Sequence, residues 1–193
     1  MKGYDEYAED EATPALGAVV ETGRGSLPFA LIHGEALVAC ASWALGEAGV
    51  TSVDLGTEWA GLVDSGEPFV LHDPLCPMTP AAFIAGCVAR AVETGRIVVG
   101  VRPVTDTVKS VDGGAVGETV DRDGLRAVVS PIVLPADVVA ALDGVPTADF
   151  SMLVEWLRGA HPVELVDAPP EARRVATEQD LRLLEALTRP ASA

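Results

Sequence analysis

The segment Pro68-Phe-Val-Leu-His-Asp-Pro-Leu-Cys-Pro77 decides how this chain folds. Its apolar run Phe-Val-Leu is bounded by proline and is too short for a helix, so it predicts a buried strand. A helix should follow, with Thr79 as its cap, Pro80 at its first position and Gly95 after its last turn. Asp73 would then lie just beyond the carboxyl end of a strand that leads into a helix.

That position allows two interpretations of Asp73. In an open α/β sheet, ligands bind outside the carboxyl ends of the strands, which favours a functional carboxylate. The dipeptide Asp-Pro is also common in turns, so the same residue could serve only to shape the turn. This stretch alone leaves both interpretations open.

Strand-like and helix-like patterns alternate along the rest of the chain. Strands are expected at 16–20, 51–55, 69–71, 97–101 and 163–166, and helices at 36–48, 80–94, 135–142, 147–158 and from Thr177 onward. In the last helix, Asp180 occupies the third position, as in a capping box. Residues 56–67 follow no clear pattern. The alternation predicts one three-layer α/β domain over residues 15–193.

One insertion interrupts this alternation. Two β-type runs, 108–111 and 115–120, flank Gly113-Gly114 and predict a hairpin arm over about residues 106–126. The runs carry little apolar area, and an isolated hairpin is marginally stable at best. The arm is therefore expected to project and to pack on a second subunit, which predicts a homodimer.

Composition narrows the functional classes. The 193 residues include 29 acidic and 13 basic ones, a net charge of −16, which argues against a nucleic-acid partner. Cys40, Cys76 and Cys87 show no Cys-x-x-Cys spacing, which favours free thiols and a cytoplasmic location.

His72 lies four residues before Cys76, but without a second pair no metal site is predicted. No apolar run reaches about 18 residues, so no membrane span is expected. Residues 1–14 are expected to form a mobile acidic tail.

The loop Gly23-Arg24-Gly25 is a candidate for nucleotide binding. Glycines allow backbone N–H groups to approach an anion, so Gly23 and Gly25 could hold phosphate. The alternative is a flexible strand-to-helix turn, and Glu21 beside the loop would repel phosphate. No Gly-Lys-Ser/Thr follows, so the loop is not a Walker A motif.

Two further motifs lie at the base of the predicted arm. They are Thr105-Asp-Thr-Val-Lys109 and Thr119-Val-Asp-Arg-Asp-Gly-Leu125. Paired strands would bring Thr hydroxyls, Lys109 and Arg122 together, where charge-assisted hydrogen bonds could hold a sugar phosphate. The alternative is an arm anchored by ion pairs of Arg122 with neighbouring Asp residues, which are worth little at a surface.

Taken in order, the His-Asp strand end, the two arm motifs, Ser130-Pro131 and Val175-Ala-Thr-Glu-Gln-Asp-Leu181 resemble the 2-C-methyl-D-erythritol 4-phosphate cytidylyltransferase family. The resemblance implies a Rossmann-like nucleotidyltransferase sandwich, a homodimer joined through the arm, and Mg²⁺ as cofactor. It also implies a reaction of CTP with methylerythritol phosphate that releases pyrophosphate in non-mevalonate isoprenoid synthesis.

The resemblance assigns roles to several residues. Asp73 would lie beside the substrate hydroxyls and the reacting phosphate. Thr107 and Arg122 would reach the sugar phosphate from the partner subunit, while Ser130 and Arg174 would contact the same substrate. Arg122 and Arg174 should then converge near Ser130 and form an anion site, with Asp73 too far away to pair with them.

Departures from the family pattern concern the triphosphate and the base. Leu27 and Phe29 stand where the family has two cations, and Cys76 stands where it has an arginine. Residues 51–67 are too few for the family's cytosine-reading segment. Cytidylyl transfer is therefore expected to be weak or absent. Two alternatives remain: a working Mg²⁺-dependent transferase in which Arg24 replaces the lost cations, and a non-catalytic relative that binds a phosphorylated metabolite or a protein.

Overall fold

The computed structural model describes residues 13–54, 56–104, 108–112, 115–120 and 124–189. Six strands form the main sheet in the order β10-β6-β9-β5-β1-β4. Their bounds are β1 Ala15–Val19, β4 Val50–Ser52, β5 Phe69–His72, β6 Ile97–Pro103, β9 Arg126–Leu134 and β10 Val163–Asp167. The helices are α1 Leu37–Glu47, α2 Trp59–Ser65, α3 Ala81–Thr94, α4 Ala136–Ala141, α5 Phe150–Arg158 and α6 Glu178–Leu187, with 3₁₀ turns η1 Leu27–Phe29 and η2 Pro170–Ala172.

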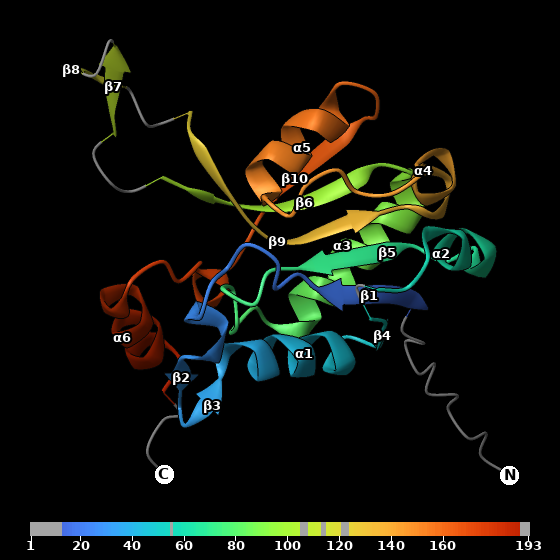
Figure 1. Cartoon of the computed structure of the whole chain (residues 1–193), viewed down its shortest axis with the longest axis horizontal. Helices are drawn as coiled ribbons and strands as arrows, with labels where there is room; N and C mark the ends of the chain where they lie inside the picture. The colour runs from blue at the N-terminus through green and yellow to red at the C-terminus, as the bar shows by residue number, and fades with distance from the viewer. Residues whose placement is uncertain (1–12, 55, 105–107, 113–114, 121–123, 190–193) are drawn as a thin grey trace, which may run out of the picture.

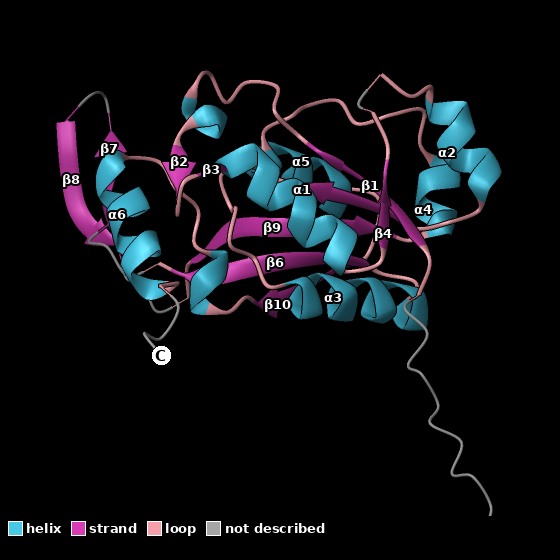
Figure 2. Cartoon of the chain, turned by 90° about the horizontal axis from the view of Figure 1, so that it is seen from below, coloured by secondary structure: helices cyan, strands magenta, loops and turns pink. Residues whose placement is uncertain are grey.

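The sheet is the middle of three layers, as the alternation predicts. Along β5, Val70 packs in the cluster that also holds residues of α1 and α3, whereas Leu71 packs in the cluster that holds residues of α4 and α5. Figures 1 and 2 show α1 and α3 together on one face of the sheet. Because successive side chains of a strand point to opposite faces, strands covered on both faces are apolar throughout.

One strand of the sheet runs against the others. β5 and β1 are parallel neighbours, and so are β6 and β10, but β9 lies between β5 and β6 and is antiparallel to both. β9 was not foreseen as a strand. It returns from the arm and carries Ser130 to the carboxyl end of β5.

Several element boundaries differ from the expected ones by a few residues. Pro80 is the N-cap of α3 instead of its first residue, because the hydroxyl of Thr79 donates to the carbonyl of Cys76 and does not cap the helix. α5 begins only at Phe150, because the side chain of Asp149 accepts the amide hydrogen of Met152 and caps the helix there. The capping box of Thr177 and Asp180 is confirmed.

Other differences add elements. Residues 56–67, which had no assignment, contain α2. The second strand is shorter than expected and ends at Ser52. β2 (Leu31–Ile32) and β3 (Glu35–Ala36) form a small hairpin that was also missed.

The predicted arm is present as the antiparallel pair β7 (Val108–Asp112) and β8 (Ala115–Val120). It projects away from the main sheet (Figure 1). Its root continues β6 and β9, where Pro103 pairs with Arg126. The proposed contact of the arm with a second subunit stays a prediction. Residues 1–12, which make up most of the expected acidic tail, lie outside the described residues. Within the described part of the chain, no helix has the length and apolarity needed to cross a membrane.

β6 and β9 approach each other closely at Gly100. A Cβ atom built on Gly100 would lie 2.7 Å from the carbonyl oxygen of Ser130 and 3.0 Å from its carbonyl carbon. The pairing of the two strands also shifts register between Val99 and Val101. Glycine at position 100 therefore allows β9 to place Ser130 beside the end of β5.

We predict that Gly100→Ala lowers the free energy of unfolding by about 1–3 kcal/mol, because the methyl group meets backbone atoms that cannot rotate away. Urea unfolding monitored by circular dichroism measures this change. Gly86→Ala is the matched control: apart from its chain neighbours and the backbone of its own helix, no heavy atom lies within 4 Å of the added Cβ, and alanine favours the helix interior. Equal stability of the two variants would show that β9 shifts freely at this point.

Candidate active site

Asp73 stands at the carboxyl end of β5 with its side chain almost fully buried. The amide of Val20 donates to the carbonyl of His72 at 2.8 Å, which keeps the ends of β1 and β5 side by side. The side chain of Asp73 is only 2% exposed. A buried carboxylate requires hydrogen-bond donors or cations around it, because an isolated charge away from water is strongly unfavourable.

Two arginines from distant parts of the chain supply these cations. Nε of Arg24 donates to Oδ1 of Asp73 at 2.9 Å, and Nε of Arg174 donates to Oδ2 at 3.0 Å. The amide of Leu75 also donates to Oδ1 at 3.0 Å. We call Arg24, Asp73 and Arg174 the arginine–aspartate cluster. The expectation that Asp73 is too far from Arg174 to pair is therefore wrong. Among the described residues, Asp73 is the ion-pair partner of Arg174.

Arg24 is held by contacts on several sides. Besides its bond to Asp73, its Nη2 donates to the carbonyl of Ala148 at 2.8 Å. Its guanidinium lies over the ring of Phe150, with the central carbon 5.6 Å from the ring centroid, which is within the range of a cation–π contact. The side chain is 7% exposed. Arg24 thus joins the loop after β1, the end of β5 and the segment before α5.

The glycine loop directs Arg24 inward. Gly23 and Gly25 have φ angles of 78° and 60°, which glycine adopts readily. The amide of Arg24 donates to the carbonyl of Glu21 at 3.1 Å. The loop is thus a tight turn whose central side chain reaches Asp73. Phosphate binding by the amides of Gly23 and Gly25 stays a prediction.

Arg174 reaches Asp73 from the other side. The amide of Val175 donates to the carbonyl of Leu75 at 2.7 Å, and both side chains pack in one apolar cluster with Leu184 of α6. These contacts fix the backbone next to Arg174. Its own side chain is 39% exposed, so it faces both the buried carboxylate and the surface.

Ser130 and His72 fix the backbone of Asp73. The amide of Asp73 donates to Oγ of Ser130 at 3.0 Å, and the same oxygen contacts Nδ1 of His72. We assign the hydroxyl hydrogen to the bond with Nδ1, which leaves the ring hydrogen on Nε2. That nitrogen has no hydrogen-bond partner within the described structure. Both side chains are fully buried.

The structure places only part of the predicted substrate site. It brings Asp73, Ser130, Arg24 and Arg174 together at one edge of the sheet. Direct contact of Ser130 with a substrate stays a prediction; in this structure its hydroxyl is buried and engaged with His72 and Asp73. Thr107 and Arg122 lie outside the described residues.

The three departures from the family pattern occupy apolar or surface positions. Leu27 is half-buried against an apolar cluster, whereas Phe29 is 63% exposed. Cys76 is buried, and burial raises the pKa of its thiol well above the usual range, with a further contribution from Asp73. Cys76 is therefore a neutral thiol. These three side chains supply no positive charge.

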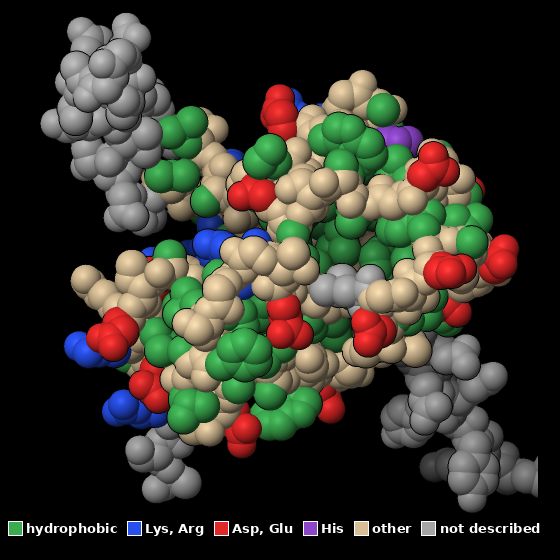
Figure 3. Space-filling view, in the orientation of Figure 1, with side chains coloured by type: hydrophobic (Ala, Val, Ile, Leu, Met, Phe, Trp, Pro, Cys, Tyr) green, Lys and Arg blue, Asp and Glu red, His purple; other side chains and the backbone are tan. Residues whose placement is uncertain are grey.

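A basic hollow opens beside the arginine–aspartate cluster. It has a volume of about 710 Å³ and lies between the outer ends of β6 and β9 and the start of α6, lined in part by Arg102, Arg173 and Arg174. Figure 3 shows basic side chains gathered in a hollow on this face. Nη1 of Arg102 donates to the carbonyl of Ala168 at 3.1 Å, which holds its guanidinium at the edge of the sheet. Three cations and one carboxylate, Asp180, line this hollow in a strongly acidic chain.

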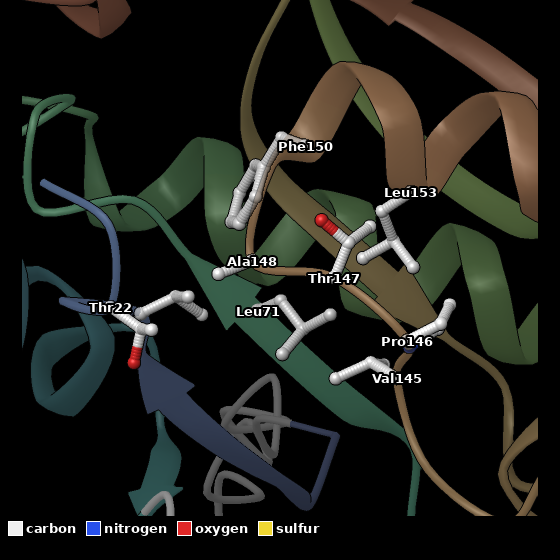
Figure 4. Close-up of a pocket in the computed structure, with 9 residues that line it drawn as sticks. Thr22, Leu71, Val145, Pro146, Thr147, Ala148, Phe150 and Leu153 are labelled. Atoms are coloured by element: carbon white, nitrogen blue, oxygen red, sulfur yellow. The ribbon is translucent and has the colours of Figure 1, made fainter.

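A second, apolar pocket of about 260 Å³ is lined in part by Ala148 and Phe150, which Arg24 contacts. Figure 4 shows Leu71, Val145, Phe150 and Leu153 among the side chains around it. Thr22 and Thr147 are its polar members. Its walls come from the ends of β1 and β5 and from the segment that Arg24 binds through Ala148.

The residues at Asp73 do not fit a magnesium site. Oδ1 already accepts two hydrogen bonds, and both carboxylate oxygens face guanidinium groups, whereas Mg²⁺ needs oxygen ligands without competing cations. The described residues contain no group of three or more His, Cys, Asp or Glu side chains that could hold a metal ion. Any Mg²⁺ bound here would depend on ligand phosphates.

Comparison with known proteins decides the family. The model of the family "2-C-methyl-D-erythritol 4-phosphate cytidylyltransferase" matches residues 46–189. The chain belongs to this family. It is 43% identical over 122 residues to the enzyme of that name from Nocardia farcinica, covering 62% of this chain and 52% of the relative. It is 38% identical over 150 residues to the one from Rhodococcus opacus, covering 72% of this chain and 65% of the relative.

The fold agrees with this assignment. The crystal structure of the Thermus thermophilus family member superposes with a TM-score of 0.67 at 24% identity, over 90% of this chain and 98% of that one. The Rossmann-like nucleotidyltransferase sandwich is thus confirmed. The chain spans only about half to two thirds of the length of the two curated relatives named above.

Some members of the site were missed from sequence. Arg102 follows the apolar run 97–101 within β6, and Arg173 precedes Arg174, but neither stands in a motif that marks a ligand site. Ala148 contributes only its backbone carbonyl. A cation directly after a buried apolar run was a signal that pointed to Arg102.

We predict that the buried ring of His72 makes the protein less stable in acid. Burial lowers the pKa of His72 from 6.5 to about 4, partly opposed by Asp73. Between these values the unfolded chain binds the proton more readily than the folded chain does, so the free energy of unfolding falls as pH drops from about 6.5 to about 4. The loss from this group is at most about 3–4 kcal/mol.

Urea unfolding at pH 7, 6 and 5 measures this effect in the wild type and in His72→Gln, whose amide can still bond to Ser130. The difference in stability between the two proteins should shift in favour of the variant as pH falls. A difference that stays constant over this range would mean that His72 keeps an ordinary pKa in the folded protein.

Proposed function

We propose that this chain binds a phosphorylated polyol of the methylerythritol phosphate class and transfers cytidylyl groups from CTP slowly or not at all. The observation that carries this proposal is the arginine–aspartate cluster at the edge of the basic hollow. The reaction class comes from the family. We infer slow cytidylyl transfer from the residues of this chain, because Arg24 is engaged with Asp73 and is not free to bind a triphosphate.

The charge of the basic hollow is evidence for an anionic ligand. Arg102, Arg173 and Arg174 line it, and guanidinium groups bind phosphate through paired, charge-assisted hydrogen bonds. Asp73 does not line the hollow but is bound by Arg174, which does. In the proposed complex Asp73 accepts hydrogen bonds from the hydroxyl groups of a polyol. A ligand with phosphate at one end and hydroxyls at the other matches this order of groups.

The contacts of Arg24 support the proposal that cytidylyl transfer from CTP is slow. It was the one residue available to replace the two family cations, but it is committed to Asp73, Ala148 and Phe150. Each charge-assisted contact with a triphosphate is worth about 1.5–3 kcal/mol. Loss of two of them corresponds to about 3–6 kcal/mol, or about 10²–10⁴ in rate.

The region between β4 and β5 points the same way. In this chain α2 fills much of it, and Trp59 of α2 donates from its ring nitrogen to the carbonyl of Val139 at 3.0 Å. Trp59 also packs edge-on against Phe69. The segment therefore closes the end of the core, and base recognition would have to come from elsewhere.

A working cytidylyltransferase is the second candidate, favoured by the family assignment over residues 46–189. In that case, binding of CTP with Mg²⁺ would draw Arg24 away from Asp73 toward the triphosphate. The two candidates differ in turnover.

We predict that protein supplied with CTP, Mg²⁺ and methylerythritol phosphate releases pyrophosphate far more slowly than the roughly 1 s⁻¹ of an ordinary enzyme. A coupled pyrophosphate assay measures the rate. The double substitution Leu27→Arg with Phe29→Lys, which restores the two family cations, should increase it. Wild-type turnover of about 1 s⁻¹ or faster would establish the second candidate.

Binding is expected even where turnover is low. Calorimetric titration with methylerythritol phosphate should give saturable binding that weakens about tenfold or more in Arg174→Ala, because one charge-assisted contact is lost. Arg182→Ala is the control, since it removes a cation from the exposed side of α6, where Arg182 pairs with Glu178. Equal affinity of the wild type and both variants would exclude the hollow as the binding site.

A further inference from the structure

The two arginines on Asp73 differ in how firmly they are held. Arg24 binds Asp73 and Ala148 and lies over Phe150, with 7% of its side chain exposed. Among the described residues, the side chain of Arg174 makes ion pairs and hydrogen bonds only with the carboxylate of Asp73. This side chain lines the basic hollow and is 39% exposed. One cation is a fixed part of the core, and the other is at the boundary with solvent.

This difference matters because Asp73 cannot be left alone. A buried carboxylate that loses its only cation is strongly destabilised. With Arg24 in place, Asp73 keeps one cation and the amide of Leu75 when Arg174 leaves. One carboxylate and two guanidiniums also give the cluster a net charge of +1, so the cluster attracts a further anion.

We propose that Arg24 is a positioning residue that keeps Asp73 paired, so that Arg174 can exchange the carboxylate for the phosphate of a ligand. This inference rests on the proposed anion site and names the residue that makes it available. Arg24 does not touch the ligand. It lowers the cost of moving Arg174, and the ligand phosphate then replaces Asp73 as the partner of Arg174.

A double-mutant cycle with inorganic phosphate as the probe tests this exchange. In Arg24→Gln, Asp73 has Arg174 as its only cation, and the affinity for phosphate measured by calorimetry should fall about tenfold or more. In Asp73→Asn, Arg174 has no carboxylate to leave. Adding Arg24→Gln to Asp73→Asn should therefore change the affinity by less than about threefold, and this non-additivity is the expected result.

A long-range electrostatic effect of Arg24 would give a different pattern. Loss of one positive charge would then weaken phosphate binding by the same factor in the wild-type background and in the Asp73→Asn background, and that outcome overturns the inference. Arg158→Gln controls for net charge: Arg158 lies on α5, pairs with Glu155, and is exposed. The affinity of the Arg158→Gln variant for phosphate should equal that of the wild type.

Nuclear magnetic resonance of the wild type provides a measurement that requires no variant to fold. Phosphate should shift the Nε–H resonance of Arg174 more than that of Arg24, and the slow hydrogen exchange of Arg24 Nε–H should persist. A larger shift at Arg24 than at Arg174, or loss of slow exchange at Arg24, contradicts the exchange.

The two proposals can fail separately. If the wild type does not bind phosphate, or binds it as well as Arg174→Ala does, the proposed anion site is excluded. The exchange is then excluded with it. Phosphate binding that needs Arg174 but shows no coupling between Arg24 and Asp73 would preserve the anion site and exclude only the role given to Arg24.

Discussion

The buried carboxylate of Asp73 is the constraint on which the described site depends. Its 2% exposed side chain requires compensation, and the chain supplies it from the loop after β1, from the turn after β5 and from the segment before α6. Each contact ties a different part of the fold to the end of β5. The cluster therefore joins three segments that the apolar core alone would leave less closely defined.

The antiparallel strand β9 makes this arrangement possible. In a sheet built only from consecutive βαβ units, β6 would be expected beside β5. Here β9 returns from the arm between them, and Ser130 of β9 accepts the amide hydrogen of Asp73. The same strand extends to the root of the arm, so the arm and the Asp73 site share one continuous element. Gly100 permits the close approach of β6 to β9 at this point.

The arginine–aspartate cluster also gives physical meaning to the differences from the family. The loop after β1 has two glycines, and the cation between them, Arg24, turns inward to a carboxylate. Positive charge lines the basic hollow, where we propose that a phosphate group binds, and is absent at Leu27 and Phe29. In the function proposed above, the pairing of Arg24 with Asp73 and the absence of cations at positions 27 and 29 would favour recognition of a phosphorylated metabolite over activation of a nucleotide.

The sequence by itself determined the local features. Apolar runs bounded by proline and glycine predicted β1, β5 and β6, the Thr177–Asp180 capping box predicted the start of α6, and a Gly-Gly turn between β-type runs predicted the arm. The motifs from Pro68 onward predicted the family. These features depend on neighbours within a few residues, so composition and spacing are enough to reveal them.

Only the tertiary structure decided which of these features meet. Arg24 lies 49 residues before Asp73, and Arg174 lies 101 residues after it. Their convergence depends on strand order, on the insertion of β9 and on the Leu75–Val175 contact, none of which has a local sequence signal. For this reason the resemblance placed Arg174 away from Asp73, whereas the folded chain pairs the two. The resemblance also gave no sign that the hydroxyl of Ser130 binds His72 and the backbone of Asp73. A pairing between side chains is set by the path of the backbone between them, and that path is a property of the whole sheet.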